Sequence, residues 1–434
     1  MRYKDYFAIA IPFIISTITQ PLLGAVDTAV IGQLPNPAYI GGVAVGAVIF
    51  NTLYWLLGFL RVSTSGFSAQ SLGTNKKDDI YLAYLRPFII GLFISFIFIL
   101  LQVPILKGAM KIYNPEPLVL ESATKYFKIL IWGAPLVLLG YVNLGWIMGR
   151  KLIKETMFIQ ISSNVVNIIL DFVFVFKFNM KVEGVAYATL ISQFYAFIIG
   201  IIVISKKISL QESITYKNEI FNKSEIKKVM FVNLDLMIRT TCLLTMTNMF
   251  VARGNKFGAN ILAANAILFQ IQYIISYFYD GLANASSIFI GKAIGSKNKK
   301  EFKDTIKISD ISILYVAIFM SLIMFFFSKS FIKIFTDIES VLDISLQYSF
   351  WLSIFPLVIG VGLVYYGVFT GATLTAPIRN SMIYSLIAFL ICYFIAIPVW
   401  GNHGLWLSFI IFSLGRSVFL YLEKNKLDKA LELK

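Results

Sequence analysis

The sequence predicts an all-α membrane protein with twelve transmembrane helices in two six-helix lobes, related by a pseudo-two-fold axis along the membrane normal. Three observations lead to this prediction. The 434-residue chain is 58% hydrophobic and only 14% charged, whereas a soluble chain carries about 25% charged residues. Its apolar residues form runs long enough to cross a hydrocarbon core about 30 Å thick as helices. The second half of the chain also repeats the first. This composition excludes a soluble enzyme, a nucleic-acid-binding protein and a disordered chain.

The apolar runs are separated by short polar segments. Each run has about 20 residues or more and no alternation of apolar and polar positions, which excludes the strands of a membrane β-barrel. The first run is too long for a signal peptide and lacks a typical cleavage site, so we expect it to remain as a span. In chain order, the predicted spans cover residues 6–31, 40–66, 80–106, 122–148, 156–177, 184–205, 227–252, 259–291, 308–329, 344–370, 379–400 and 404–422.

The basic residues, which give the chain a formal net charge of +15, lie between the apolar runs. If the N-terminus is cytoplasmic, the inside loops hold about 24 lysines and arginines and the outside loops about 10, a bias that follows the positive-inside rule. We therefore expect both termini to be cytoplasmic. This placement also argues against nucleic acid as the partner of the positive charge.

Three pairs of matching segments reveal an internal repeat. Their equivalent residues are separated by nearly one offset: Pro135 and Pro356 by 221, Gly73 and Gly295 by 222, and Gly184 and Gly404 by 220. Six spans return the chain to its starting side, so the two halves have the same orientation. The predicted domains are an N-terminal lobe over residues 1–205, a polar cytoplasmic linker over 206–224 and a C-terminal lobe over 225–434.

Ionisable residues inside spans mark candidate working parts, because each costs at least about 2.5–3.5 kcal/mol on insertion scales. Asp27 lies in span 1 and Asp171 in span 5, where Asn167 projects from the same helical face. Thr189 in span 6 adds a hydroxyl oxygen. These oxygen ligands suit a proton shared between acids or a hard cation. The alternative is structural: Asp27 caps a helix end and Asp171 pairs with nearby Lys177.

Other polar residues in the spans have possible conformational roles. Asp235 and Arg239, four residues apart in span 7, are expected to neutralise one another. An offset of 219 places Arg61 of span 2 on Asp280 of span 8, which suggests a polar latch between the lobes. The alternative is that Asp280 pairs within its own lobe and Arg61 reaches the cytoplasmic interface. Pro12 removes a helical hydrogen bond in span 1 and permits a bend.

Several motifs together resemble the multidrug and toxic compound extrusion (MATE) transporters, and within them the DNA-damage-inducible F-like branch. The resemblance covers the whole chain, and no single motif is decisive. The motifs lie at residues 26–32, 167–171, 183–189, 233–240, 279–281, 371–373, 379–382 and 401–406.

The resemblance implies a secondary active multidrug efflux transporter in the bacterial inner membrane. It implies export of organic cations and xenobiotics by alternating access, in exchange for protons or sodium ions, by a monomer surrounded by membrane lipid that needs no cofactor. The family's cation site, including a possible Na+ site, maps onto Asp27, Asn167, Asp171 and Thr189. Its helix-bending proline maps onto Pro12.

Two other functions remain as alternatives. A lipid-linked oligosaccharide flippase of the same superfamily would need cationic residues to hold pyrophosphate, and the spans contain only Arg61, Arg239 and Arg416. A membrane-embedded enzyme would need a catalytic set such as a paired histidine and carboxylate. The single histidine, His403, lies in a predicted loop and does not supply one.

Overall fold

A computed structural model of the chain describes residues 3–18, 30, 37–113, 115–209, 217–336 and 338–432. Within these ranges the chain is helical, with short connections and no strands. Eleven helical segments of the described residues are long and apolar enough to cross a membrane. They coincide with the second to twelfth predicted spans, and α1 (Tyr3–Ile18) lies at the position of the first. The prediction of an all-α, multi-pass membrane protein is confirmed.

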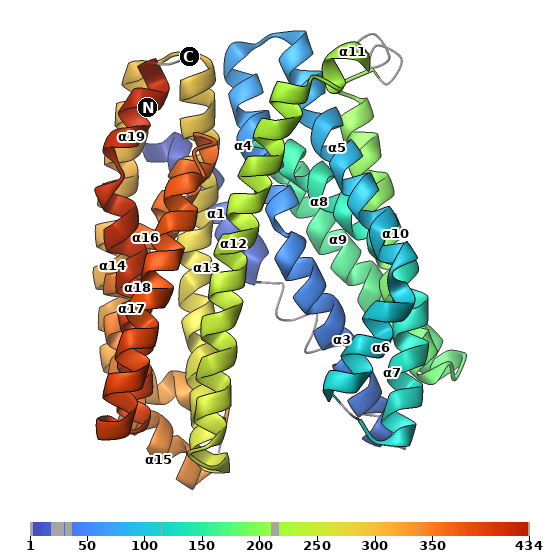
Figure 1. Ribbon diagram of the computed structural model, residues 1–434, viewed down its shortest axis with the longest axis vertical. Helices are drawn as coiled ribbons and strands as arrows, with labels where there is room; N and C mark the ends of the chain where they lie inside the picture. Colours follow the sequence, from blue (N-terminus) through green and yellow to red (C-terminus); the bar gives the residue numbers. More distant parts are fainter. Residues whose placement is uncertain are drawn as a thin grey trace. The chain divides into compact units, whose positions relative to one another are not determined.

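The helices group into two compact units, coloured by sequence in Figure 1. Unit 2 comprises residues 18–230, and within it α8 packs against α4, α5 and α10, while α3 packs against α7. Its elements are α3 (Pro37–Leu57), α4 (Phe59–Thr74), α5 (Lys77–Leu100), α6 (Gln102–Tyr113), α7 (Pro117–Leu130), η1 (Ile131–Gly133), α8 (Ala134–Gly149), α9 (Ile153–Phe172), the π-helical turn η2 (Val173–Lys177), α10 (Lys181–Ser205) and α11 (Lys217–Ile220).

Unit 1 comprises Met1–Thr17 and Phe231–Lys434. Helix α16 is its centre and packs against α13, α14 and α18, while α17 packs along α18. Besides α1, its helices are α12 (Lys223–Asn255), which begins in unit 2, α13 (Ala259–Gly295), α14 (Lys299–Lys333), α15 (Glu339–Tyr348), α16 (Phe350–Gly371), α17 (Ala376–Trp400), α18 (Asn402–Leu422) and α19 (Asn425–Glu432).

Helix α1 groups with unit 1, whereas the sequence-based division placed it with the N-terminal half. The buried Tyr6 hydroxyl donates to the Leu282 carbonyl at 3.0 Å and lies 2.7 Å from the Ser286 hydroxyl. A Cβ added at Gly281 would lie 2.2 Å from Ile14 Cγ1, so this glycine is what lets α1 approach α13 closely. The Tyr6 ring also stacks on Phe289, so several contacts join α1 to α13 within unit 1.

The described ends of the linker pack on α5 of unit 2. The Ser209 amide donates to the Tyr81 hydroxyl at 2.9 Å. Arg86 donates to the Glu219 carbonyl at 2.9 Å and pairs with the Glu225 carboxylate at 3.6 Å. Residues 210–216 lie outside the described ranges. The predicted tether is thus held to one unit at both of its described ends.

Close helix contacts repeat in the two halves at one offset. A Cβ added at any of four glycines would lie 2.0–2.5 Å from a carbonyl oxygen of a neighbouring helix: Gly145 from Arg61, Gly149 from Ser65, Gly367 from Ala283 and Gly371 from Ser287. An offset of 222 residues relates the two halves: it takes Gly145 to Gly367 and Gly149 to Gly371. The same offset takes each carbonyl residue of the first half to its counterpart in the second. Small residues let helix backbones approach in membranes, so α4 on α8 and α13 on α16 are one packing unit used twice.

This contact register corrects the equivalence that suggested a latch. Arg61 corresponds to Ala283 rather than to Asp280, and Asp280 corresponds to Gly58. The offset of 219 came from residues before Gly58, where the first half is interrupted between α3 and α4, while α13 continues without a break. Applying that offset beyond the interruption shifted the alignment by about one helical turn. The repeat therefore does not place opposite charges at equivalent sites.

Candidate ion site and charged clusters

Helix α9 carries two of the predicted site residues on its buried face. Asn167 is 1% exposed and Asp171 is 0% exposed. On the opposite face, Val165 and Ile169 are exposed, as expected for side chains that meet lipid. The polar pair therefore points into unit 2. The helix thus has its polar face inward and its apolar face outward. Asn167 and Asp171 lie on the same face of the helix, as predicted from their spacing.

Thr189 lies on α10, which packs along α9. The hydroxyl of Ser163 on α9 donates to the Ser192 carbonyl of α10 at 3.2 Å. The two helices are antiparallel neighbours, so one turn from this contact brings Asn167 on α9 to about the level of Thr189 on α10. The Thr189 hydroxyl donates to the Val185 carbonyl at 3.0 Å, which leaves its oxygen lone pairs available to accept.

A π-helical turn begins two residues after Asp171. This turn, η2, spans Val173–Lys177, and single π turns inside α-helices occur frequently at functional sites. Phenylalanine rings pair on both sides of it, Phe172 with Phe176 at 5.5 Å and Phe174 with Phe178 at 6.1 Å between centroids. This π turn was not predicted from the sequence, because residues 172–178 carry no glycine, proline or other helix-breaking residue.

Asn167 has an unusual hydrogen-bond state. Its Nδ2 atom is buried and has no hydrogen-bond partner among the described residues, although such groups are almost always paired. Asp27 lies outside the described residues, so its position in the predicted site stays a prediction. Lys177, the structural partner considered for Asp171, is exposed while Asp171 is fully buried. Within the described ranges, no group of three or more histidine, cysteine or acidic residues could hold a metal ion.

Asp235 of unit 1 pairs with Arg379 on α17, at 2.7 Å, and accepts a second hydrogen bond from the Thr375 hydroxyl at 2.8 Å. The expectation that Asp235 and Arg239 neutralise one another is therefore wrong. Arg239 instead places its guanidinium 4.3 Å from the centre of the Tyr366 ring. Spacing along one helix identified a possible partner but could not reveal the partner that lies 144 positions away.

A second charged cluster in unit 1 surrounds Arg416, which is 8% exposed. Its guanidinium lies 5.9 Å from the Phe412 ring and within electrostatic reach of Arg239 and Asp280. Asp280 thus has a charged neighbour in its own unit. This agrees with the alternative to the latch, in which Asp280 pairs within its own lobe. Arg61 belongs to unit 2, where it is half-buried.

Pro12 lies inside α1, which is helical on both sides of it, and its bending role stays a prediction.

Comparison with known proteins agrees with this architecture. The MatE family model matches residues 12–173 and 236–399. DNA damage-inducible protein F of Escherichia coli is 31% identical over 420 residues, which cover 96% of this chain and 91% of that protein. A probable multidrug resistance protein NorM of Photorhabdus laumondii is 20% identical, with 96% and 94% covered.

Solved structures share the fold. A crystal structure of a MATE protein in a bent conformation has a TM-score of 0.87 at 17% identity, with 99% of this chain and 96% of that chain covered. A transporter of the MOP superfamily from Pyrococcus furiosus has a TM-score of 0.85 at 18% identity, with 99% and 96% covered. The match across both halves, together with the 31% identity over nearly the whole length, shows that the chain belongs to the MatE family of multidrug and toxic compound transporters and is not an enzyme.

Proposed function

We propose that the protein exports organic cations and related xenobiotics in exchange for protons or sodium ions. We propose further that Asp171, Asn167 and Thr189, together with Asp27, form the ion site. The observation that carries this proposal is the complete burial of Asp171 beside Asn167 on the inward face of a membrane helix. A carboxylate in that position is costly as a free anion. A proton or a small cation that neutralises it would therefore bind there.

Exchange follows if ion and substrate favour different states of the transporter. A ligand shifts a conformational equilibrium only by its differential affinity for the two states. Neutralisation of Asp171 by the coupling ion would favour the state that has released its substrate, and loss of that ion would restore a negative site for an organic cation. Pro12 would permit a bend of α1 during the change, because proline lacks the amide that completes the helical hydrogen bond.

The oxygen set fits either coupling ion. A proton needs only one of the two aspartates. A sodium ion would use several oxygens, and Asn167 and Thr189 supply an amide oxygen and a hydroxyl oxygen at about one level of α9 and α10. The proposal therefore includes both ions.

The charged cluster of unit 1 favours a second candidate, transport of a substrate that carries an anion. Arg416 is buried near Arg239, and Asp280 is the acidic residue known to lie within its electrostatic reach. Two guanidinium groups with one carboxylate leave a positive balance, which a phosphate or carboxylate of a substrate would neutralise. A lipid-linked oligosaccharide flippase would require such a site.

Transport in proteoliposomes tests the first proposal. Protein would be reconstituted with ethidium as the fluorescent organic cation, and a pH gradient or a sodium gradient would be imposed one at a time. We expect one gradient to drive ethidium movement and Asp171→Asn to abolish it, while the thermal unfolding midpoint stays within a few degrees. Asp78→Asn, at the exposed start of α5, is the matched control and should transport normally.

Two results would contradict this function. Full ethidium transport by Asp171→Asn would show that the ion site does not depend on α9. Absence of ethidium transport under both gradients, combined with movement of a lipid-linked pyrophosphate that depends on Arg239 and Arg416, would favour the flippase.

A further inference from the structure

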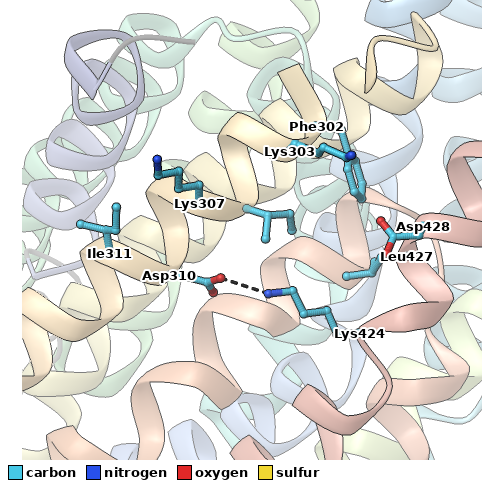
Figure 2. Close-up of a pocket in the computed structure, with 9 residues that line it drawn as sticks. Phe302, Lys303, Lys307, Asp310, Ile311, Lys424, Leu427 and Asp428 are labelled. Carbon is cyan, nitrogen blue, oxygen red and sulfur yellow. Dashed lines mark hydrogen bonds and ion pairs between the residues drawn. The ribbon is translucent and has the colours of Figure 1, made fainter. Parts of the chain in front are cut away.

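A cavity of about 410 Å³ opens in unit 1 between the start of α14 and the end of α18 with α19 (Figure 2). It belongs neither to the proposed ion site nor to the Arg416 cluster. Ile306, Ile311 and Leu427 provide apolar parts of its lining, and the remainder is mostly charged. The cavity thus combines an apolar surface with ionic groups, the combination that an amphiphile requires.

The charges of the cavity favour an anion. Its lining includes the lysines Lys303, Lys307 and Lys424 and the aspartates Asp310 and Asp428, so three positive charges face two negative ones. Lys424 is already engaged, because its ammonium group pairs with Asp310 at 3.0 Å. In Figure 2 this pair is the contact marked among the residues drawn, and Lys303 and Lys307 make none with either aspartate.

Asp310 is committed to the protein. Besides Lys424, it accepts a hydrogen bond of 2.6 Å from the Tyr365 hydroxyl. The Lys424 ammonium also lies 5.5 Å from the Tyr365 ring and 5.0 Å from the Tyr421 ring. This ion pair, whose Lys424 and Asp310 side chains are 31% and 38% exposed, forms one wall of the cavity. The lysines of the lining outside this ion pair are Lys303 and Lys307, which are four residues apart on one face of α14. Asp304, between them on the helix but outside the lining, lies within electrostatic reach of Lys307.

The cavity lies where the lipid-facing surface of unit 1 ends. Large apolar side chains are exposed on α14 from Leu314 and Tyr315 onward, and on α18 as far as Leu422. Lys424 follows Leu422 by two residues, and Lys307 precedes Leu314 by about 10 Å of helix. That distance is about the depth of the headgroup layer plus a lysine side chain. By the charge of the loops, this end of the unit is expected to be cytoplasmic.

We propose that this cavity binds a phospholipid with a singly charged anionic headgroup, such as phosphatidylglycerol. Its phosphate would lie between Lys303 and Lys307, and its acyl chains would leave along the exposed apolar face of α14. One phosphodiester charge matches the single excess positive charge of the lining. A dissolved anion would satisfy the lysines but would not use the neighbouring lipid-facing surface. Basic pockets between helices at this side of a membrane are known to hold anionic headgroups.

Thermal unfolding of the purified full chain in a neutral detergent tests the proposal. Phosphatidylglycerol, phosphatidylcholine and glycerol 3-phosphate would be added separately. We expect phosphatidylglycerol to raise the unfolding midpoint by several degrees and the other two to leave it nearly unchanged. The double variant Lys303→Gln with Lys307→Gln should bind phosphatidylglycerol about thirtyfold more weakly. Lys303→Arg with Lys307→Arg should retain most of the binding.

A matched control uses the other end of the same helix. Lys329→Gln with Lys333→Gln removes the same charge from exposed positions of α14 and should keep the full response to phosphatidylglycerol. Lipid retained in native mass spectra provides a readout that does not depend on unfolding, should the glutamine variant be unstable. Equal loss of lipid from both glutamine variants would overturn the proposal, as would an equal response to glycerol 3-phosphate, which would indicate a soluble anion.

Discussion

Asp235 on α12 and Arg379 on α17 form a partly buried ion pair at 2.7 Å, which joins residues 144 positions apart in the chain. The two side chains are unequally buried: Asp235 is 8% exposed and Arg379 is 33% exposed. Thr375 adds a hydroxyl donor to the same carboxylate, and Arg379 also donates to the Asn380 amide oxygen at 3.0 Å. The carboxylate thus depends on its partners more than the guanidinium does.

This asymmetry predicts unequal effects of the two single substitutions. Arg379→Gln should destabilise unit 1 by about 1.5–3 kcal/mol, because it leaves a buried carboxylate without its cation. Asp235→Asn should cost less, since Arg379 still reaches water and Asn380. Thermal unfolding in detergent measures both. Lys426→Gln, which breaks an exposed pair with Glu423, is the control and should change stability by less than about 0.5 kcal/mol. Equal losses for the two variants would contradict this account.

Asn167 offers a test that separates ion binding from structure. Its buried Nδ2 atom has no hydrogen-bond partner among the residues described, so Asn167→Leu should leave the unfolding midpoint unchanged or raise it. The same substitution should weaken the dependence of transport on the coupling ion at least about tenfold, because it removes the amide oxygen. A variant that loses stability but keeps its ion dependence would show that Asn167 is structural.

Thr189 makes a more specific prediction. Thr189→Val removes the hydroxyl oxygen and should lower the apparent affinity for the coupling ion several-fold, whereas Thr189→Ser should retain it. Thr156 has the same kind of hydroxyl bond, to the Leu152 carbonyl at 2.9 Å, but lies three turns from Asn167 on α9. Thr156→Val is therefore the matched control and should leave ion affinity unchanged. Similar ion affinities for the valine and serine variants at position 189 would exclude a ligand role for the hydroxyl.

The repeated glycine contacts predict a clear contrast in stability. Gly367→Ala and Gly145→Ala would bring a Cβ to 2.0 and 2.4 Å from carbonyl oxygens of neighbouring helices, and each should destabilise by about 1–3 kcal/mol. Gly140 lies on the same helix as Gly145 and has no atom within 4 Å of an added Cβ. Gly140→Ala should therefore be neutral or stabilising. The measurement is the thermal unfolding midpoint, and unchanged midpoints for all three would argue against close packing at the repeat.

The sequence by itself determined the helical membrane architecture and its repeat. Hydropathy depends only on composition within about 20 consecutive residues, so the spans could be read directly, and the matched segments around Gly73 and Gly295 showed the duplication. The pairing of Asn167 with Asp171 on one face was also predictable, because helical periodicity sets the direction of side chains four residues apart.

Tertiary structure alone decided the long-range partners. Asp235 pairs with Arg379 rather than with Arg239, and α1 packs on α13 through Tyr6 and Gly281. Neither relationship has a local signal, because each joins residues more than 100 positions apart. The glycine contacts with carbonyl oxygens likewise determined which residues of the two halves are equivalent. The sequence alone was misleading there, because the interruption at Gly58 changes the offset between the halves from 219 to 222 within a single predicted span. Periodicity orients a side chain on its own helix, but only the packing of helices determines what that side chain meets.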